Sequence, residues 1–286
     1  MNDRLSALIL LAGFGSLLAC NEATLSLFPK ADALTDTGGT APLSGTSGAS
    51  VAGDANAGSG GTVAAGSGGG AGTGAQAGAT STADGLVGQW PLDDDTNDAV
   101  GVNDGTLQGS ATFVTDADRG QVLRCDGQGA GFFVANLTSA SFSYAFWVWT
   151  DTPSNQNGGA LEGNPLLWAN TAGAVDDFTL SLMNNRLDYI GYSQTTAGAA
   201  NVVDGTWHHV AVTREDGDSV FLYLDGIQDG SCDAGSGPVT SNPLVYVGGN
   251  PVDHRYFTGL IDDLRQYDRA LGADEVQTLF TTTALP

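Results

Sequence analysis

Basic side chains are scarce in this chain of 286 residues. Nine Lys and Arg residues stand against 32 Asp and Glu residues, which gives a formal net charge of -23 at pH 7. Because DNA- and RNA-binding proteins gain much of their affinity from cations that neutralise phosphates, this charge excludes nucleic acid as a partner. Glutamate is also rare, with 4 Glu against 28 Asp. Since Asp is typical of turns and of calcium sites, Ca²⁺ is the cofactor that the composition suggests.

Long apolar runs are absent apart from one near the start of the chain. Leu5–Ala19 form an apolar run of 15 residues behind Arg4, whereas a membrane-spanning helix takes about 20 residues. The run therefore has the length of a signal-peptide core. It ends in Leu17-Leu18-Ala19-Cys20, which resembles the lipobox of bacterial lipoproteins. The resemblance implies that 1–19 is a lipoprotein signal peptide, with a plain secretory signal as the alternative.

The lipobox resemblance also implies a cellular location. Cys20 would carry the lipid, and the membrane would be contacted through this anchor alone. Asn21 stands where many lipoproteins of the inner membrane have Asp. We therefore expect a lipid-anchored protein of the bacterial outer membrane or cell surface, and a position facing the periplasm stays open.

The segment 20–85 lacks the residues that build a core. It is rich in Gly, Ala, Ser and Thr, and no aromatic residue follows Phe28 within it. Such a composition cannot bury enough apolar surface to fold, so we predict a disordered tether. A coil of this length and composition spans roughly 40–50 Å, which would hold a domain clear of a membrane surface.

The remaining segment, 86–286, is predicted to be one all-β domain. It contains all five Trp and all seven Tyr residues of the chain. Short segments alternate there with Gly, Asp and Asn, which is the pattern of strands and turns. The segment 142–149 is apolar on both faces, so it is expected at the centre of a sandwich. The clearest strand segments are 142–149, 178–183, 186–192, 207–213, 220–225 and 243–249.

Two further local signals lie in this domain. Asp225-Gly226 follows "FLYL" and predicts a tight hairpin, because a type I′ turn needs positive φ at both central positions. Helical spacing occurs at 271–280, with Gly272 as a tolerable N-cap and Asp274 and Glu275 favouring the N-terminal end of the helix dipole. We expect a short surface helix at the end of the domain.

Seven strings in a fixed order carry a family resemblance. They are "GQWPLDDD" (88–95), "NDGTL" (103–107), "SFSYAFWVW" (141–149), "DGTWHHVAVTR" (204–214), "VFLYLDG" (220–226), "VYVGG" (245–249) and "FTGLIDDLRQYDRALGADEV" (257–276). Together they resemble the laminin-G-like, concanavalin A-like jelly-roll domains. The resemblance implies a two-sheet antiparallel sandwich of about twelve to fourteen strands, often with one structural Ca²⁺. Members bind carbohydrate, mediate adhesion or serve as accessory modules.

A calcium site is predicted from carboxylates at the two ends of the domain. Ca²⁺ takes six to eight oxygen ligands, which flexible acidic loops supply. The family resemblance places a ligating acid at the "IDD" step, where strand alternation would send Asp262 and Asp263 to opposite faces, so either could be the ligand. Ordinary loop caps are the alternative reading of all these residues. The predicted donors are Asp93, Asp94, Asp104 and one of Asp262 and Asp263, with Asp95 and Asp98 in the same loop.

Cysteine is rare, with three in the chain. Cys125 and Cys232 remain after Cys20, and an even pair in an exported protein favours a disulfide. The alternative is a buried thiol at Cys125 and a loop thiol at Cys232.

Catalytic patterns are absent from the sequence. Laminarinase-type glucanases with this sandwich place acids in an E-x-D-x-x-E string, because retaining hydrolysis needs two carboxylates about 5–5.5 Å apart. The only Glu residues of the domain are Glu162, Glu215 and Glu275, in three separate segments. His208 and His209 are expected on opposite faces of a core strand, where packing explains them better than catalysis. We therefore predict a protein that is not an enzyme.

Loops rich in Asn and Gly supply the candidate ligand site. Sugar sites combine aromatic faces with Asn, Asp and Arg, because a pyranose has an apolar face and a ring of hydroxyls. The predicted function is a surface-anchored module that binds an extracellular glycan or a surface protein. The alternatives are a structural envelope module and a glycan-active enzyme. The loops are 155–164, 194–201 and 250–256, and the candidate contacts are Trp168, Tyr192, His254, Arg255 and Tyr256.

Overall fold

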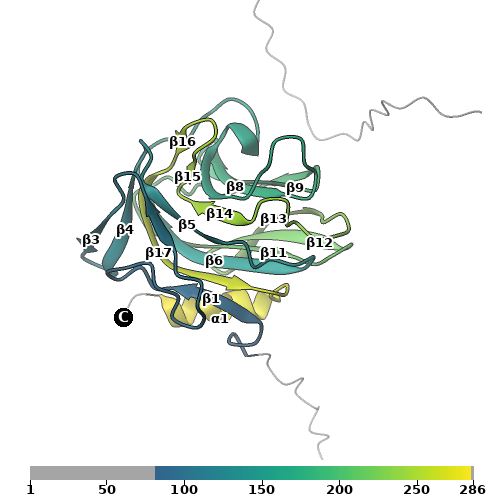
Figure 1. The fold of residues 1–286 in the computed structure, drawn as a ribbon, viewed down its shortest axis with the longest axis horizontal. Coiled ribbons are helices and arrows are strands. Elements are labelled where there is room, and N and C mark those ends of the chain that lie inside the picture. Colours follow the sequence, from purple (N-terminus) through teal and green to yellow (C-terminus); the bar gives the residue numbers. More distant parts are fainter. Residues whose placement is uncertain (1–80, 285–286) are drawn as a thin grey trace, which may run out of the picture. The chain divides into compact units, whose positions relative to one another are not determined.

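The computed structural model describes residues 81–284 as a β-sandwich with one C-terminal helix (Figure 1). The predicted signal peptide, the tether and the lipidation site at Cys20 lie outside the described residues. No helix within 81–284 has the length and apolar character that a bilayer span requires.

Two antiparallel sheets form the sandwich, as predicted. Sheet A has eight strands, in the order β13-β12-β11-β6-β17-β4-β3 with β1 paired to β17, and sheet B has seven, in the order β10-β9-β8-β7-β14-β5-β2. Sheet A comprises β1 (Leu86–Trp90), β3 (Thr112–Asp116), β4 (Gly120–Asp126), β6 (Phe142–Trp149), β11 (Trp207–Arg214), β12 (Ser219–Leu224), β13 (Ile227–Asp233) and β17 (Thr258–Tyr267). Sheet B comprises β2 (Thr106–Gln108), β5 (Gly131–Ala135), β7 (Asn164–Trp168), β8 (Phe178–Met183), β9 (Arg186–Gly191), β10 (Gln194–Ala197) and β14 (Leu244–Val247).

The number of strands exceeds the twelve to fourteen implied by the resemblance. The difference comes from short pieces such as the three-residue β2 and from a separate hairpin of β15 (Gly249–Asn250) and β16 (Arg255–Tyr256). A single 3-10 turn, η1 (Ala160–Glu162), precedes β7.

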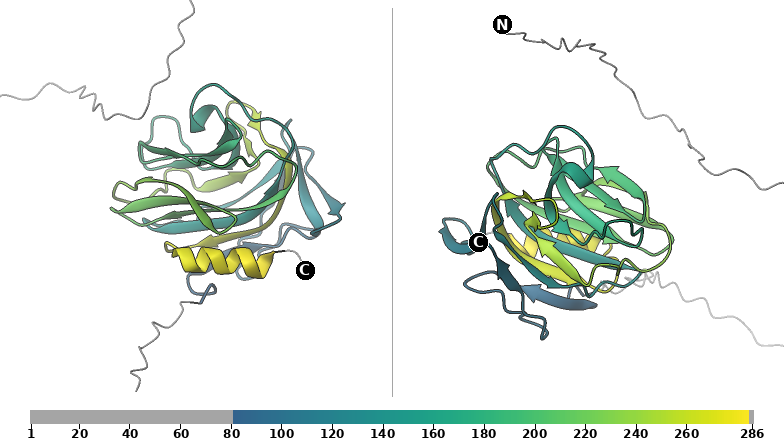
Figure 2. Two further views of the ribbon diagram at one scale, coloured as in Figure 1. Left: turned by 180° about the vertical axis from the view of Figure 1, so that it is seen from behind. Right: turned by 45° about the horizontal axis from the view of Figure 1, so that its top comes forward.

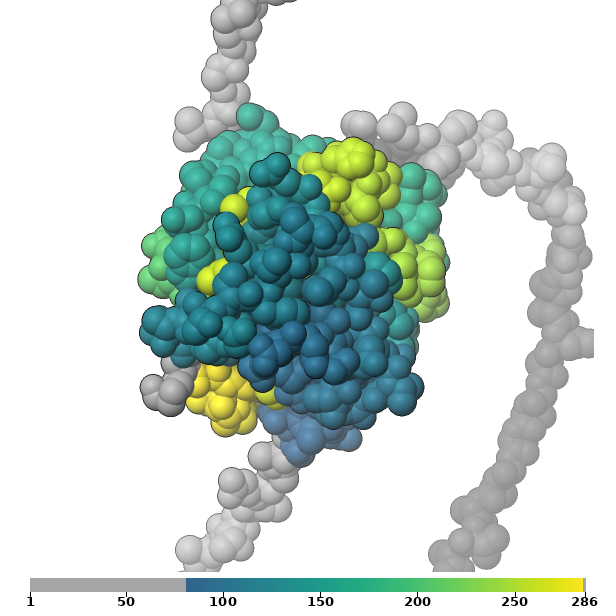
Figure 3. All heavy atoms as spheres, turned by 60° about the vertical axis from the view of Figure 1, so that its left-hand side comes forward, coloured from purple at the N-terminus to yellow at the C-terminus, as the bar shows by residue number. Residues whose placement is uncertain are grey.

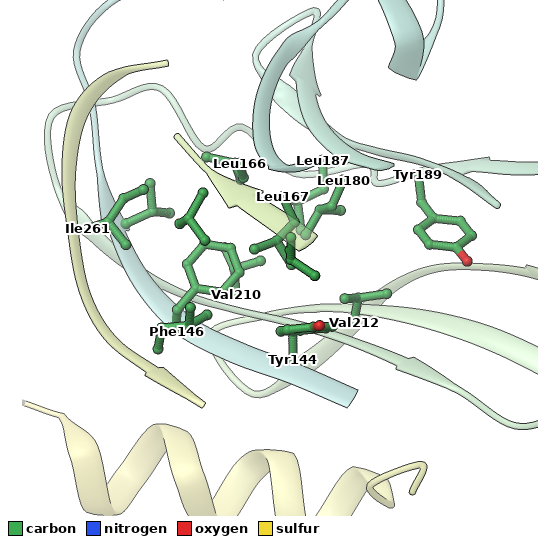
Figure 4. Close-up of a cluster of buried hydrophobic side chains, with 14 of the residues drawn as sticks. Tyr144, Phe146, Leu166, Leu167, Leu180, Leu187, Tyr189, Val210, Val212 and Ile261 are labelled. Atoms are coloured by element: carbon green, nitrogen blue, oxygen red, sulfur yellow. The ribbon is translucent and has the colours of Figure 1, made fainter. Parts of the chain in front are cut away.

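The core fills the space between the sheets. Leu166, Leu167, Leu180 and Leu187 point from sheet B toward side chains of sheet A (Figure 4). Strand alternation explains most of this arrangement, since every second residue faces the partner sheet. The irregularity of β7 between Pro165 and Leu167 lets the consecutive residues Leu166 and Leu167 both face the core. The facing residues of sheet A include Tyr144, Phe146, Val210, Val212 and Ile261.

Local predictions within the sandwich are confirmed. The strand 142–149 is β6, which lies between β11 and β17 and is buried over all but its last residue. The turn Asp225-Gly226 joins β12 to β13 with φ values of 52° and 76°. Both values lie in the left-handed region that a type I′ hairpin requires.

The C-terminal helix α1 (Ala273–Thr283) covers the outer face of sheet A, as the second view shows (Figure 2). Val276 and Leu279 bury the helix's apolar side against Ala145, Ala211 and Tyr267. The helix begins after Gly272, whose backbone N–H donates to the Glu275 carboxylate at 2.9 Å. The predicted helix therefore exists and ends three residues later than expected.

The predicted disulfide is not formed. Cys125 lies buried on β4 and Cys232 lies on β13, and both are free thiols. Four strands of sheet A separate the two. With strands about 4.8 Å apart, the cysteines are roughly 24 Å from each other, whereas a bridge needs Cα atoms within about 7 Å.

A candidate ligand cleft on the outer face of sheet B

Three aromatic residues form a row on the outer face of sheet B. Trp168 of β7 is paired with Tyr246 of β14, and Tyr246 is paired with Phe133 of β5. Their neighbours along each strand, Val245 and Val247 among them, point into the core, so the row faces outward. The rings of Phe133 and Tyr246 have their centroids 5.7 Å apart. We call Phe133, Tyr246 and Trp168 the aromatic row.

The hairpin of β15 and β16 places an arginine over one end of the aromatic row. Its turn is held by Asn250, which is fully buried, donates its side-chain N–H to Asp253 and accepts from the Val252 backbone at 2.9 Å. Asn164 of β7 ties the hairpin down by donating to the Tyr256 carbonyl at 3.1 Å. The result is that the Arg255 guanidinium carbon lies 5.6 Å from the centroid of the Trp168 ring.

A cleft of about 440 Å³ opens at this end of the row. One wall is the loop after β7, which is closed by Thr171 donating to the Asp177 carboxylate at 2.8 Å. In the space-filling view, the hairpin residues near 250 lie at the top of the domain in yellow-green, and helix α1 lies at the bottom in yellow (Figure 3). The cleft is lined by Leu161, Glu162, Trp168, Asn170, Thr171, Ala172, Gly173, Ala174, Val252, Asp253 and Arg255.

Two residues that line the cleft carry buried hydrogen-bond donors that lack a partner. Trp168 is only 5% exposed, and its indole Nε1 is buried without an acceptor. The Nε of Arg255 is likewise buried and unpartnered, while its Nη2 forms an ion pair with Asp253. A third unpartnered polar atom, Oγ1 of Thr179, belongs to the residue directly opposite Trp168 on β8. Since buried polar groups are normally hydrogen-bonded, these atoms mark a place for an acceptor-bearing ligand or ordered water.

Carboxylates surround the single cation of the cleft. Asp253 pairs with Arg255. Glu162 also lines the cleft, and its carboxylate accepts from the Gly159 backbone N–H at 2.9 Å. Behind Glu162, burial raises the pKa of Asp188 to about 6; Arg186 lowers it and Glu162 adds to the rise. Two carboxylates therefore line the cleft with its one arginine, and the Asp188 carboxylate lies near Glu162.

The structure brings together two of the five predicted contacts, Trp168 and Arg255. His254 and Tyr256 contact each other, with His254 Nδ1 3.3 Å from the Tyr256 hydroxyl, and neither lines the cleft. Tyr192 lies elsewhere, because its ring packs on Arg214 with the guanidinium carbon 5.5 Å from the ring centroid. Of the three predicted loops, 155–164 and 250–256 meet at the cleft and 194–201 does not.

Tyr246 and Phe133 were missed by the sequence reasoning. The signal for Tyr246 was present, because "LVYV" at 244–247 alternates and places Tyr246 opposite the core side of Val245 and Val247. Phe133 carries no such signal, since its neighbour Phe132 is equally apolar and either could have faced the core.

The predicted calcium ligands do not converge. Asp262 pairs with Arg119 and Asp263 pairs with Arg265, at 2.6 Å and 2.9 Å. Asp98 accepts backbone N–H groups from Gln89, Val100 and Asn103, and thus shapes its own loop. Within residues 81–284, no three His, Cys, Asp or Glu side chains form a group that could hold a metal. The predicted donors therefore do not form one closed Ca²⁺ site within residues 81–284, and calcium binding stays a prediction.

The fold and the cleft can now be compared with known proteins. A laminin G model, described as "Concanavalin A-like lectin/glucanases superfamily", matches residues 126–277, just over half of the chain. The chain belongs to this superfamily. No curated protein matches the sequence significantly.

Solved structures of similar fold include binding domains. Domain 4 of AbnA, a GH43 extracellular arabinanase from Geobacillus stearothermophilus solved with arabinotriose, has a TM-score of 0.54 and 22% identity over 68% of this chain and 97% of that domain. The binding domain of Paraclostridial Mosquitocidal Protein 1 has a TM-score of 0.57 and 17% identity over 71% of this chain and 53% of the other. The binding domain of Botulinum Neurotoxin DC in complex with SialylT has a TM-score of 0.54 and 13% identity, over 70% and 51%.

Each of these likenesses shows a shared fold alone, because the sequences are so different. The chain spans about half the length of the two toxin binding domains. Of these three structures, the arabinanase domain is the one that this chain covers almost completely.

Proposed function

We propose that this domain is a non-catalytic module that binds glycans in the cleft beside Trp168 and Arg255. The observation that carries the proposal is the pair of unpartnered, buried N–H donors on these two residues. A sugar offers the hydroxyl and ring oxygens that such donors need, and the indole offers an edge to its apolar face. The arabinotriose complex of the arabinanase domain supports the choice of a glycan.

The proposed setting is the one that the sequence predicts. A lipid on Cys20 would anchor the chain to the outer membrane or cell surface, and the segment 20–85 would let the domain reach an extracellular glycan. A protein ligand is the second candidate, supported by the toxin binding domains among the structures of similar fold.

The test is binding of the full chain to a panel of polysaccharides, measured by affinity electrophoresis and calorimetry. Arg255→Ala should weaken binding at least about tenfold, because a hydrogen bond to a charged group contributes about 1.5–3 kcal/mol. Arg124→Ala is the matched control, since Arg124 is an exposed arginine on β4 of sheet A. Binding that survives Arg255→Ala, or the absence of any glycan ligand, contradicts the proposal.

The same samples decide between binding and hydrolysis. Asp188, with its pKa raised to about 6, and the nearby Glu162 are the carboxylates next to the cleft that resemble an acid pair. We expect no release of reducing sugar from any bound polysaccharide. Release that stops in Asp188→Asn would show a glycan-active enzyme instead.

A further inference from the structure

We propose that the ligand is a linear, uncharged glycan that lies across strands β5, β14 and β7, with one end in the cleft. This inference rests on the proposed function and specifies it in two ways. It adds Phe133 and Tyr246 as binding residues, and it names the charge class of the ligand.

The aromatic row provides the track for such a ligand. Phe133, Tyr246 and Trp168 stand on three adjacent strands in direct register and on the same face. Strands lie about 4.8 Å apart, so the row extends over roughly 10 Å at right angles to the strands. Phe133 and Tyr246 are partly exposed, whereas Trp168 is almost covered by Arg255. The Phe133 and Tyr246 rings can therefore carry sugar rings on their faces, while the Trp168 end offers hydrogen bonds.

The cleft would hold the terminal sugar of the glycan. Its unpartnered atoms include two pure donors, Trp168 Nε1 and Arg255 Nε. Both need an acceptor, and a terminal sugar presents several oxygen acceptors close together. The aromatic row and these donors are continuous, since Trp168 belongs to both.

The charges around the cleft exclude an anionic ligand. The positive charge of Arg255 is matched by Asp253, and Glu162 adds a further negative charge to the lining. The chain as a whole carries a formal charge of -23. A uronate or sialate would therefore meet repulsion without a free cation to pair with, and like charges are an effective way to reject a ligand.

The first experiment measures affinity as a function of oligosaccharide length. For wild type, affinity should rise from the monosaccharide to the tetrasaccharide of the bound neutral glycan. The double variant Phe133→Ala/Tyr246→Ala should keep the short-ligand affinity and lose the gain for longer ones, by roughly five-fold per ring removed. Phe221→Ala is the control, because Phe221 is a partly buried aromatic on the outer face of sheet A.

The second experiment compares neutral with uronate-containing oligosaccharides of equal length at low salt. We expect only the neutral oligosaccharides to bind the wild-type domain. Glu162→Gln should reduce the difference in affinity between neutral and uronate-containing oligosaccharides. If uronates bind better, or if the double variant keeps the full gain with length, this inference is overturned while glycan binding stands. If Arg255→Ala leaves all glycan binding intact, or no glycan binds, the proposed function itself fails. Circular dichroism and melting curves show that each variant is folded before it is compared.

Discussion

Arg119 and Asp262 form an ion pair in which each side chain is more than nine-tenths buried. Their Nε and Oδ2 atoms are 2.6 Å apart, and the side chains are 6% and 7% exposed. The guanidinium carbon of Arg119 also lies 4.3 Å from the centroid of the Trp147 ring. Its Nη1 donates to the Thr283 carbonyl at 3.2 Å, which links the β3–β4 hairpin to the end of helix α1.

Removing Arg119 should therefore destabilise the domain strongly. Arg119→Ala leaves the Asp262 carboxylate buried without its cation, and breaking a buried pair in this way costs about 3–5 kcal/mol. The free energy of unfolding in urea measures the effect. Arg124→Ala is the exposed control on the next strand and should cost less than about 0.5 kcal/mol. Equal losses in both variants would contradict the structural role of the pair.

The buried His209 should make the domain sensitive to acid. Burial lowers its pKa to about 4, against an ordinary value of 6.5. Between these values the unfolded chain binds a proton that the folded chain does not, so His209 makes stability fall as the pH drops from about 6.5 to about 4. Asp262 acts in the opposite direction, because burial raises its pKa to about 6 and its protonation favours the folded state.

Comparing variants separates these two effects. In His209→Gln, the stability lost between pH 7 and pH 4.5 should be smaller than in wild type by about 2 kcal/mol. His208→Gln is the neighbouring control, and its effect on the pH dependence of stability should have the opposite sign. The hydrogen bond to Asp225 raises the pKa of His208, so its contribution is present at acid pH and is lost as the pH rises through that raised value. Urea unfolding across this pH range provides the measurement, and an unchanged acid loss in His209→Gln would contradict the assignment.

Ca²⁺ binding by this domain should be weak and confined to the loop that holds Asp93 and Asp94. Asp93, Asp94 and Asp104 are the exposed predicted ligands for which no arginine partner is seen among residues 81–284. Of these, Asp93 and Asp94 line a shallow depression of about 330 Å³ together with Asp95 and Asn97. Because the site is so open, its Kd for Ca²⁺ should be about 1 mM or weaker. Calorimetry after EGTA treatment should show this weak binding and its loss in Asp93→Asn/Asp94→Asn. A tighter site, or one abolished by Asp263→Asn alone, would show that the loop is not the ligand.

The two thiols should behave independently. Burial raises the pKa of Cys125 to about 12 and that of Cys232 to about 11, so neither is expected to react readily with iodoacetamide in the folded domain at neutral pH. Dithiothreitol should leave the melting temperature unchanged. Alkylation after denaturation without reductant, followed by mass spectrometry, should find both residues modified. An unmodified pair that reacts only after reduction would instead establish the bridge.

Much of the fold was predictable because the relevant signals are local. The alternation of 142–149, the Asp225-Gly226 turn and the helical spacing near 271–280 each depend on a few neighbouring residues, and each is confirmed. The disulfide was not predictable in this way. Whether Cys125 and Cys232 are close depends on the order of strands in sheet A, which no local pattern reveals.

The site was only partly predictable for a related reason. Alternation would send Asp262 and Asp263 to opposite faces, but β17 has an irregularity between Asp262 and Arg265, and Asp263 adopts a φ of 46°. Asp262 then lies opposite Trp147. Burial lowers the pKa of His209, and the negative charge of Asp263 lies close enough to offset part of this lowering. Asp adopts a positive φ more often than most residues, but "IDDLRQ" lacks a turn signal of the kind that Asp225-Gly226 supplies, so the local sequence does not indicate this φ. Trp168 and Arg255 were found as single residues, but their meeting depends on how the β15–β16 hairpin folds over β7.

The first described residues of the domain lie on the side of the sandwich opposite the cleft. Ser81 and Asp84 accept hydrogen bonds from Arg269, which also pairs with Glu275 at the start of α1. This entry point belongs to the helix-bearing side of sheet A, whereas Trp168 and Arg255 lie on the outer side of sheet B. Ser81 and the cleft therefore lie on opposite sides of the sandwich, and an immobilising tag attached at Ser81 would leave the cleft accessible from solution.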